Sequence, residues 1–230
     1  MKILYQGSPG AYSHLAANEL YPDAEIVACK TFDECFRKAE KDKTLKIIIP
    51  ESNRITGNIG IEYLIFKYRL NIYAEHFFKI SHNLLGVKGC KLEDIKEVYS
   101  HAQALSQSSI FIKKNNLNGQ IRADTAGSAK YVSDTKNKTK AAIASILSAE
   151  IYDLEILKKD VQDNKENFTR FLLLGKDIVQ PENNKKSYIT SFLFKLKSKP
   201  AALYSALQGM AINGVNMIKL QSFPEKNSFS

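Results

Sequence analysis

The chain has 230 residues, 44% of them hydrophobic and 25% charged, which is enough for one large domain or two smaller ones with buried cores. No apolar run reaches the length of a membrane span, and the first residues lack the apolar segment of a secretion signal, so we expect a cytoplasmic protein without a membrane partner. The net charge of +9 comes from lysines scattered among asparagine-rich stretches without interleaved aromatic residues, which argues against a nucleic-acid partner and favours encounter with small anions.

The three cysteines and four histidines give no sign of a metal site. Cys29, Cys35 and Cys90 form no Cys-x-x-Cys pair, and no histidine belongs to a His-Glu-x-x-His element. We therefore expect neither a disulfide framework nor a bound metal, and no cofactor.

The chain up to Leu85 alternates short apolar stretches with helical patterns. Strands are predicted over 2–7, 26–29 and 45–49, with one long extended segment over 71–85. Helices are predicted from the turn Gly7–Ser13 to about Leu20, after Thr31, and over 59–68. Thr31 stands three residues before Glu34, which is the spacing of a capping box. The polar stretch 50–58 is predicted to be a loop at a strand end.

The middle of the chain repeats this alternation. Strands are predicted over 97–99, 120–123 and 140–144, and helices from Ser100 to about Lys114, after Asp124, and over 147–152. Strands alternating with helices predict a doubly wound α/β domain. Because the block from about 80 to 161 is a complete set bracketed by the first block and a returning strand at Thr169, we predict two lobes. Lobe 1 covers about 1–79 and 162–178, and lobe 2 about 80–161.

At five predicted strand ends, small residues with hydroxyl or amide groups lead into a turn or a helix start. They lie at Gly7, Pro50, Ser100, Asp124 and Asn167. In open α/β sheets such ends gather at one edge, where ligands bind. The sequence therefore predicts a cleft between the lobes that offers many hydrogen-bond donors to a small polyanion.

The pair Thr169-Arg170 stands at the start of the apolar run Phe171–Leu174. Arginine presents a planar fork of donors that matches a carboxylate, and the hydroxyl beside it can bond a neighbouring oxygen. Alternation along a strand sends the two side chains to opposite faces, so both reach one ligand only if the strand begins irregularly. Otherwise Arg170 is structural, and the stretch is a strand edge with one solvated arginine.

The composition changes after residue 178. Residues 179–187 are polar and predict a linker. Beyond the linker we predict a strand over 188–196, a helix from Pro200 to about Gly214 and a second strand over 216–220. Together these segments form a partial βαβ unit of a smaller domain over 188–230.

Five motifs in order carry a resemblance to a known family. They are Gly7–His14, Pro50…Asn53…Gly57, Ser100–Leu105, Asp124–Ala126 and Asn167–Phe171. Spread over nearly the whole chain, they resemble prephenate dehydratase. The family's Glu-Asn-Ser loop stands here as Ser52-Asn53-Arg54, so only Asn53 carries over. The tail from Tyr188 resembles the family's ACT regulatory domain without its final helix and strand.

The resemblance implies a periplasmic-binding-protein-like catalytic domain over 1–178 and a partial ACT-like, ferredoxin-like regulatory domain over 188–230. It implies decarboxylating dehydration of prephenate to phenylpyruvate, with carbon dioxide and water, in L-phenylalanine biosynthesis. Phenylalanine would be a feedback effector if the ACT domain is complete, and the chain would form a homodimer or homotetramer. Two alternatives stay open: arogenate, the aminated substrate, in place of prephenate, and a small-anion binding protein without catalysis.

The resemblance also assigns roles to single residues. Thr169 would be the catalytic residue, donating a hydrogen bond to the leaving oxygen. Substrate-binding residues would be Arg170, Phe171, Asn53, Ser100, Gln103, Ala104, Thr125, Ser8 and Ser13. Residues that bind the phenylalanine effector would be Ala202, Leu203, Asn213, Gly214, Gln221 and Ser222.

Overall fold

The computed structural model describes residues 1–178, 180 and 188–222. Contacts within the chain divide it into two units, Met1–Gln180 and Pro181–Ser230. The predicted linker over 179–187 lies outside the described residues, except for Gln180, and so do residues 223–230.

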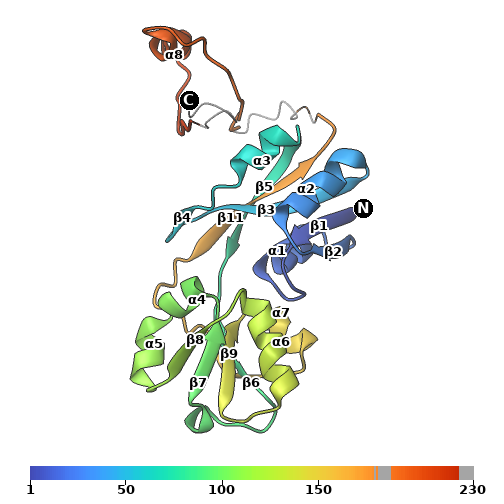
Figure 1. The fold of residues 1–230 in the computed structure, drawn as a ribbon, viewed down its shortest axis with the longest axis vertical. Coiled ribbons are helices and arrows are strands. Elements are labelled where there is room, and N and C mark those ends of the chain that lie inside the picture. Colours follow the sequence, from blue (N-terminus) through green and yellow to red (C-terminus); the bar gives the residue numbers. More distant parts are fainter. Residues whose placement is uncertain (179, 181–187, 223–230) are drawn as a thin grey trace. The chain divides into compact units, whose positions relative to one another are not determined.

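The first sheet of unit Met1–Gln180 is built from both ends of that unit (Figure 1). Its strands are β1 Lys2–Gln6, β2 Glu25–Cys29, β3 Leu45–Asn53, β4 Gly57–Asn58, β5 Asn71–Lys79 and β11 Phe168–Gly175. Its helices are α1 Tyr12–Leu20, α2 Phe32–Lys41 and α3 Glu62–Lys67. The strand order is β2-β1-β3-β11-β5, with β4 paired to β3. β1, β2 and β3 run parallel, whereas β11 runs antiparallel to β3 and β5.

Both faces of the first sheet are buried, which explains the continuous apolar run in β3. Ile47, Ile48 and Ile49 are each 0% exposed. Ile47 and Ile49 pack in a cluster with residues of α2 and α3, while Ile48 packs in another cluster with residues of α1. Because successive side chains of a strand point to opposite faces, a strand covered on both sides needs apolar residues at every position.

The second sheet is formed by the middle of the chain. Its strands are β6 Asn83–Gly86, β7 Glu97–Ser100, β8 Asn118–Ile121, β9 Lys140–Ala144 and β10 Glu155–Lys158. Its helices are α4 Ala102–Ser106, α5 Ser109–Lys114, α6 Thr125–Thr135 and α7 Ile146–Ile151, with a 3₁₀ turn at Leu92–Asp94. The strand order is β10-β6-β9-β7-β8, in which β7, β8 and β9 run parallel. These two sheets, each with its own helices, confirm the prediction of a two-lobed α/β fold (Figure 1).

The start of α2 follows the predicted capping pattern. The Thr31 hydroxyl accepts a hydrogen bond from the Glu34 backbone N–H at 3.1 Å. The Glu34 carboxylate accepts from the backbone N–H of Lys30, one residue before the cap. Two N–H groups at the start of the helix are thereby bonded by side chains, as the spacing predicts.

Long-range contacts explain three differences from the prediction. β3 runs on to Asn53 and forms a hairpin with β4, because its last residues pair with β11, so most of the predicted loop 50–58 is extended. The predicted segment over 71–85 divides into β5 and β6, which belong to different sheets. The predicted helix from Ser100 divides into α4 and α5, because the Asp163 carboxylate accepts hydrogen bonds from Ser109 and Ile110 and begins a new helix there. β10 was not predicted.

The second unit, Pro181–Ser230, contains α8 Ala202–Ile212. The helix ends at Ile212 with Asn213 as its C-cap, and Gly214 follows with φ of +67°, as its position at the predicted helix end requires. The predicted strands over 188–196 and 216–220 are wrong, since neither segment is a strand. A strand needs a hydrogen-bonded neighbour, and the side chains of Phe192 and Ile218 are 55% and 68% exposed. Of the predicted partial βαβ, ACT-like unit, the described residues therefore form the helix alone.

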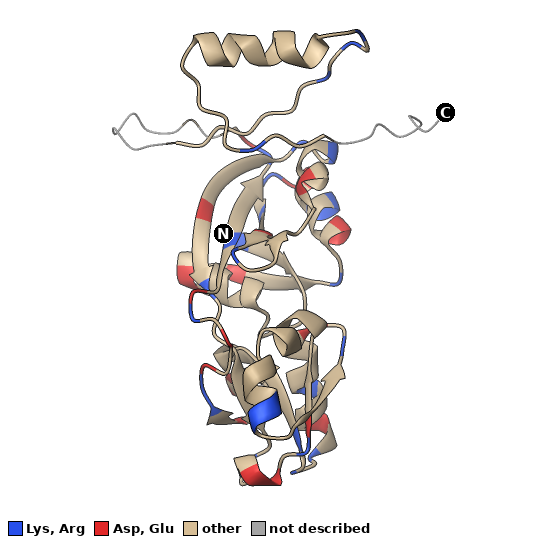
Figure 2. Cartoon of the chain, turned by 90° about the vertical axis from the view of Figure 1, so that its left-hand side faces the viewer, with Lys and Arg blue, Asp and Glu red and all other residues tan. Residues whose placement is uncertain are grey.

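Charged residues of both signs alternate over the first unit, whereas α8 carries none (Figure 2). Several of these charges form surface pairs, such as Lys2 with Glu25 at 2.8 Å. Among the helices in the described ranges, none has the length and apolar character needed to cross a bilayer.

Candidate active site

The site forms where the end of β3 meets the start of β11. The two strands are antiparallel, and Thr169 lies directly opposite Asn53. The pairing shifts register between Arg170 and Phe171, so β11 starts irregularly against β3. Two residues that are 116 positions apart in sequence are thereby placed side by side.

The Thr169 hydroxyl accepts a hydrogen bond from the side-chain amide of Asn53. The distance from Asn53 Nδ2 to Thr169 Oγ1 is 2.9 Å, and Thr169 is 6% exposed. The orientation of the Asn53 amide is fixed by its other end, because Oδ1 accepts from the backbone N–H groups of Ile55 and Thr56 at 3.0 and 3.1 Å. A backbone N–H can only donate, so the opposite end of the amide must be the donor.

This arrangement leaves the proton of the Thr169 hydroxyl available. A hydroxyl has one proton to donate and two lone pairs that accept. Since Asn53 supplies a proton to Oγ1, the hydroxyl of Thr169 is oriented with its own proton directed away from Asn53. A buried hydroxyl held in this way is suited to donating a hydrogen bond to an oxygen of a bound ligand.

Arg170 is held by two carboxylates of neighbouring strands. Its Nε and Nη2 lie 2.8 Å from Glu75 Oε2, and its Nη1 lies 3.3 Å from Glu51 Oε2. Glu51 is 5% exposed, so its carboxylate needs this cation. Three nitrogens of the guanidinium are engaged in ion pairs. The structure thus supports the structural interpretation of Arg170 and not its assignment as a clamp for a substrate carboxylate.

Four other candidate residues lie in the interior of the protein. Phe171 is 2% exposed and packs edge-on against Phe78, with ring centroids 6.4 Å apart. The Ser100 hydroxyl, 0% exposed, donates to the carbonyl of Ile143 at 2.6 Å. Ser13 and Ala104 are buried as well. The side chains of Phe171 and Ser100 are thus engaged within the protein, and their contact with substrate stays a prediction.

Ser8, Thr125 and Gln103 are accessible. The Ser8 hydroxyl donates to the Asp124 carboxylate at 3.4 Å, which joins the turn after β1 to the start of α6. Asp124 caps α6 by accepting from the backbone N–H of Gly127 at 2.6 Å, and Thr125 follows it half-buried. Gln103 is exposed at the start of α4. The strand ends of the two lobes therefore face each other here, as predicted.

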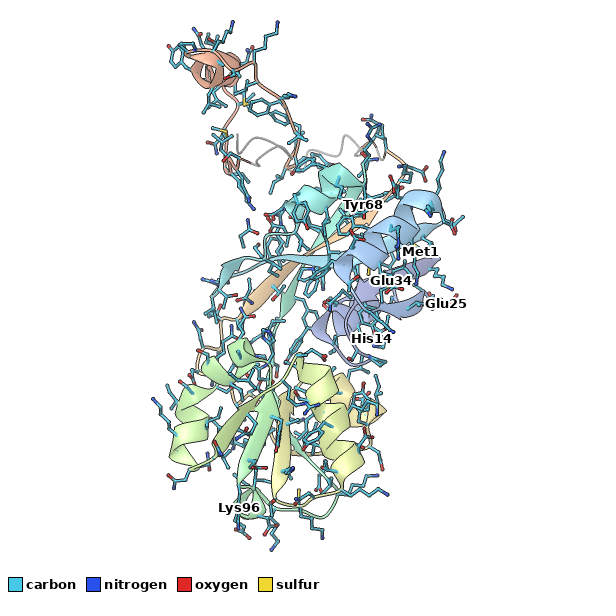
Figure 3. The ribbon with its side chains drawn as sticks, viewed as in Figure 1. Met1, His14, Glu25, Glu34, Tyr68 and Lys96 are labelled. Carbon is cyan, nitrogen blue, oxygen red and sulfur yellow. The ribbon has the colours of Figure 1, made fainter. Side chains whose placement is uncertain are left out.

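The glycine-rich turn after β1 docks the two lobes on each other. The carbonyl of Gly10 accepts from the hydroxyls of Ser145 and Ser148, at 2.5 and 3.0 Å. The Gly10 N–H donates to His14 Nδ1 at 3.2 Å, and Figure 3 labels His14 on the ribbon. Burial lowers the pKa of His14. Both backbone polar groups of Gly10 are therefore bonded within the protein.

The site assignment from sequence omitted two polar residues at the site, Asn167 and Gln107. Asn53 Nδ2 also donates to Asn167 Oδ1 at 2.7 Å, and Asn167 Nδ2 donates to Gln107 Oε1 at 3.0 Å. Asn167 is 0% exposed, although it lies in a polar stretch. Its position two residues before Thr169 places both side chains on one side of β11, which is the signal that could have identified it.

Comparison with known proteins shows the family. The profile of the family described as prephenate dehydratase matches residues 3–179. This chain belongs to the prephenate dehydratase family. It is 38% identical to arogenate dehydratase 2 of Petunia hybrida over 225 residues, which cover 97% of this chain but 57% of that relative.

Two further matches cover nearly the whole of this chain. A bifunctional N-acyl-homoserine lactone acylase/prephenate dehydratase of Komagataeibacter europaeus is 34% identical, and the match covers 99% of this chain and 82% of that protein. The crystal structure of the prephenate dehydratase of Arthrobacter aurescens in complex with L-Phe is similar in fold, with a TM-score of 0.84. That match is 22% identical and covers 98% of this chain and 77% of the other.

Proposed function

We propose that this family member catalyses the decarboxylating dehydration of prephenate to phenylpyruvate. One observation carries the proposal: the hydroxyl of Thr169 accepts from Asn53 and keeps its own proton for a ligand. The family membership supplies the reaction class. The proposed catalytic domain is residues 1–178, divided into lobes over about 1–79 with 162–178 and about 80–161.

The reaction breaks two bonds of the substrate ring and makes it aromatic. The electron pair of the bond to the ring carboxylate moves into the ring, which releases carbon dioxide. The ring carbon–oxygen bond breaks at the opposite position, and the departing hydroxyl takes up one proton to leave as water. Aromatisation supplies the driving force, so the enzyme has to bind the dianion and stabilise the developing charge on the leaving oxygen.

Thr169 is proposed to donate a hydrogen bond to this leaving oxygen. A threonine hydroxyl is too weak an acid to protonate the oxygen fully near neutral pH, so its contribution is orientation and partial proton donation. Asn53 keeps the threonine proton directed at the ligand. Ser8, Gln103 and Thr125 are the accessible candidates for hydrogen bonds to the substrate.

Arogenate is the alternative substrate, because the petunia relative is named for it. Arogenate undergoes the same elimination and carries an amino group in place of the side-chain ketone, so Thr169 would act on both. The deciding experiment incubates the purified chain with each substrate near pH 7 and measures phenylpyruvate from prephenate and phenylalanine from arogenate. We expect faster product formation from prephenate. Binding without either product would overturn the proposal and leave an anion-binding protein.

The relative from Komagataeibacter europaeus is also named an acylase. The geometry at Thr169 does not favour this second activity here. Acyl transfer to a hydroxyl needs a base that takes its proton, and the side chain bonded to Thr169 is the amide of Asn53, which cannot.

Phenylalanine is the proposed effector of the second unit, whose resemblance to an ACT domain rests on α8 and its flanking residues. Ala202 and Leu203 begin α8, and Asn213 and Gly214 follow its last residue, so the 11-residue helix separates the two pairs by about 16 Å. One phenylalanine cannot touch both pairs of one helix. We therefore propose that effector binding involves a homodimer or homotetramer, with Gln221 and Ser222 among the contacts. Assays with and without phenylalanine, together with the molar mass in solution, test this.

A further inference from the structure

A continuous series of hydrogen bonds runs from Thr169 to the opposite lobe. Its members beyond Asn53 and Asn167 are Gln107 and His82. Gln107 follows the last residue of α4 in the second lobe. Its Oε1 lies 3.0 Å from Asn167 Nδ2 and 3.0 Å from His82 Nε2. One carbonyl oxygen thus joins two buried donors from different parts of the chain.

The direction of every bond in this series follows from the Asn53 amide, whose orientation the backbone N–H groups of Ile55 and Thr56 fix. Asn53 Nδ2 must donate, as shown above, so the atom of Asn167 that faces it is the acceptor Oδ1. The other end of that amide, Nδ2, must then donate, so the atom of Gln107 that receives it is Oε1. Oε1 cannot donate, so His82 Nε2 must carry a proton.

The surroundings of His82 agree with this tautomer. His82 is 3% exposed, and burial lowers its pKa, which favours the neutral ring with one proton. With that proton on Nε2, Nδ1 is an acceptor, and the Tyr12 hydroxyl lies 2.7 Å from it. Burial raises the pKa of Tyr12, so its hydroxyl keeps its one proton, for which Nδ1 and the carbonyl of Ser81 at 2.8 Å compete.

We infer that Gln107 is a positioning residue for Thr169. By accepting from Asn167 it keeps the acceptor end of the Asn167 amide facing Asn53 Nδ2. If that amide were reversed, two donors would face each other across this 2.7 Å contact and would push Asn53 Nδ2 away from the Thr169 hydroxyl. The backbone of Gln107 is itself anchored, because its carbonyl accepts from the Asp163 N–H at 2.6 Å. Gln107 joins the second lobe to the hydroxyl at the β3–β11 junction, so that the orientation of this hydroxyl depends on both lobes.

The catalytic part of this inference rests on the proposed function. The test compares Gln107→Met, which keeps the length of the side chain but accepts no strong hydrogen bond, with Gln107→Glu, which keeps an acceptor oxygen for both donors. Ser106→Met is the matched control, because it places the same side chain on the neighbouring exposed position.

We expect Gln107→Met to lower kcat by a factor of about 10 to 100, the range for a misaligned catalytic group, while KM changes little. Gln107→Glu should recover most of this loss, and Ser106→Met should have normal kcat. Circular dichroism confirms that each variant is folded. A wild-type kcat in Gln107→Met, or an effect on KM alone, would refute the positioning role.

A second measurement does not depend on activity. In ¹⁵N-labelled wild-type protein, the His82 ring should show the chemical shifts of the neutral tautomer protonated on Nε2, and Gln107→Met should lose that preference. The tautomer protonated on Nδ1 in the wild type would overturn the inference even if the protein forms product. If the wild type forms no product from either substrate, the proposed function fails, and the His82 signal alone decides whether Gln107 organises the series.

Discussion

Thr169→Val removes one hydroxyl and keeps the shape of the side chain, which makes it the sharpest perturbation of the site. The lost acceptor leaves one N–H of Asn53 Nδ2 unpaired, while the other still donates to Asn167. Thr169 is 6% exposed, so water replaces the lost bond poorly. We expect the free energy of unfolding to fall by about 1–3 kcal/mol, the cost of one unpaired buried donor.

The effect of Thr169→Val on catalysis should be larger than its effect on folding. Loss of a positioned donor lowers turnover by a factor on the order of 10² or more. That factor corresponds to about 3 kcal/mol of lost transition-state stabilisation. Thr169→Ala should lose as much turnover, whereas Thr169→Ser keeps the hydroxyl and should retain most of it.

The assay follows product from prephenate and from arogenate under saturating substrate, so that kcat is compared at temperatures where every variant is folded. Urea denaturation of the same samples gives the free energy of unfolding. Near-normal turnover of Thr169→Val would remove the hydroxyl from the mechanism. Equal losses in Thr169→Ser and Thr169→Val would show that packing at this position matters and the hydroxyl does not.

Three further predictions follow from residues around the site. Arg170→Met should lower the free energy of unfolding by about 2 kcal/mol or more, because the Glu51 carboxylate loses its cation, and unchanged urea denaturation would contradict this. Gly10→Ala should unfold at a clearly lower temperature than Gly57→Ala: both have positive φ, but a Cβ at Gly10 would lie 2.5 Å from Ser148 Oγ and one at Gly57 meets nothing within 4 Å. Burial holds the pKa of His82 below its ordinary value of 6.5, so the unfolded chain binds more protons than the folded one as pH falls. The free energy of unfolding should therefore decrease from pH 7 to pH 5, and it should decrease less steeply in His82→Gln. An equal slope in the two proteins would refute His82 as the origin of the pH dependence.

The sequence predicts most of the architecture because the pattern of apolar residues is local. Strands covered on both faces, such as β3, show as continuous apolar runs, and the capping pair Thr31 and Glu34 marks a helix start within four residues. The nearness of Thr169 and Asn53 depends on the strand direction: Thr169 stands at the start of β11 and Asn53 at the end of β3, and the two meet because β11 runs antiparallel to β3.

The contacts of several site residues depend on partners that are distant in sequence. Arg170 is complementary to any carboxylate, and only the pairing of β11 with β3 and β5 shows that Glu51 and Glu75 already occupy it. Ser100 has the residue type of a ligand contact, yet its hydroxyl bonds a carbonyl of the adjacent strand. Gln107 and Asn167 are 60 residues apart, so no local pattern joins them.

The predicted strands after residue 187 failed for a related reason. Their apolar residues match a strand pattern, but a strand forms only when another segment completes its hydrogen bonds. In the described part of the second unit no such segment pairs with 188–196 or 216–220. A helix satisfies its own backbone, which is why α8 forms there and the strands do not.

The placement of β11 between β3 and β5 sets the order in which the two sheets can be completed during synthesis on the ribosome. β3 and β5 are synthesised early, but the strand that fills the space between them is made only after the whole of the second sheet. The second lobe therefore has every segment it needs to fold during synthesis, while the first sheet must wait with two strands unpaired on their inner edges. Closure of that sheet is a late, long-range step, and it is the same step that brings Thr169 to Asn53.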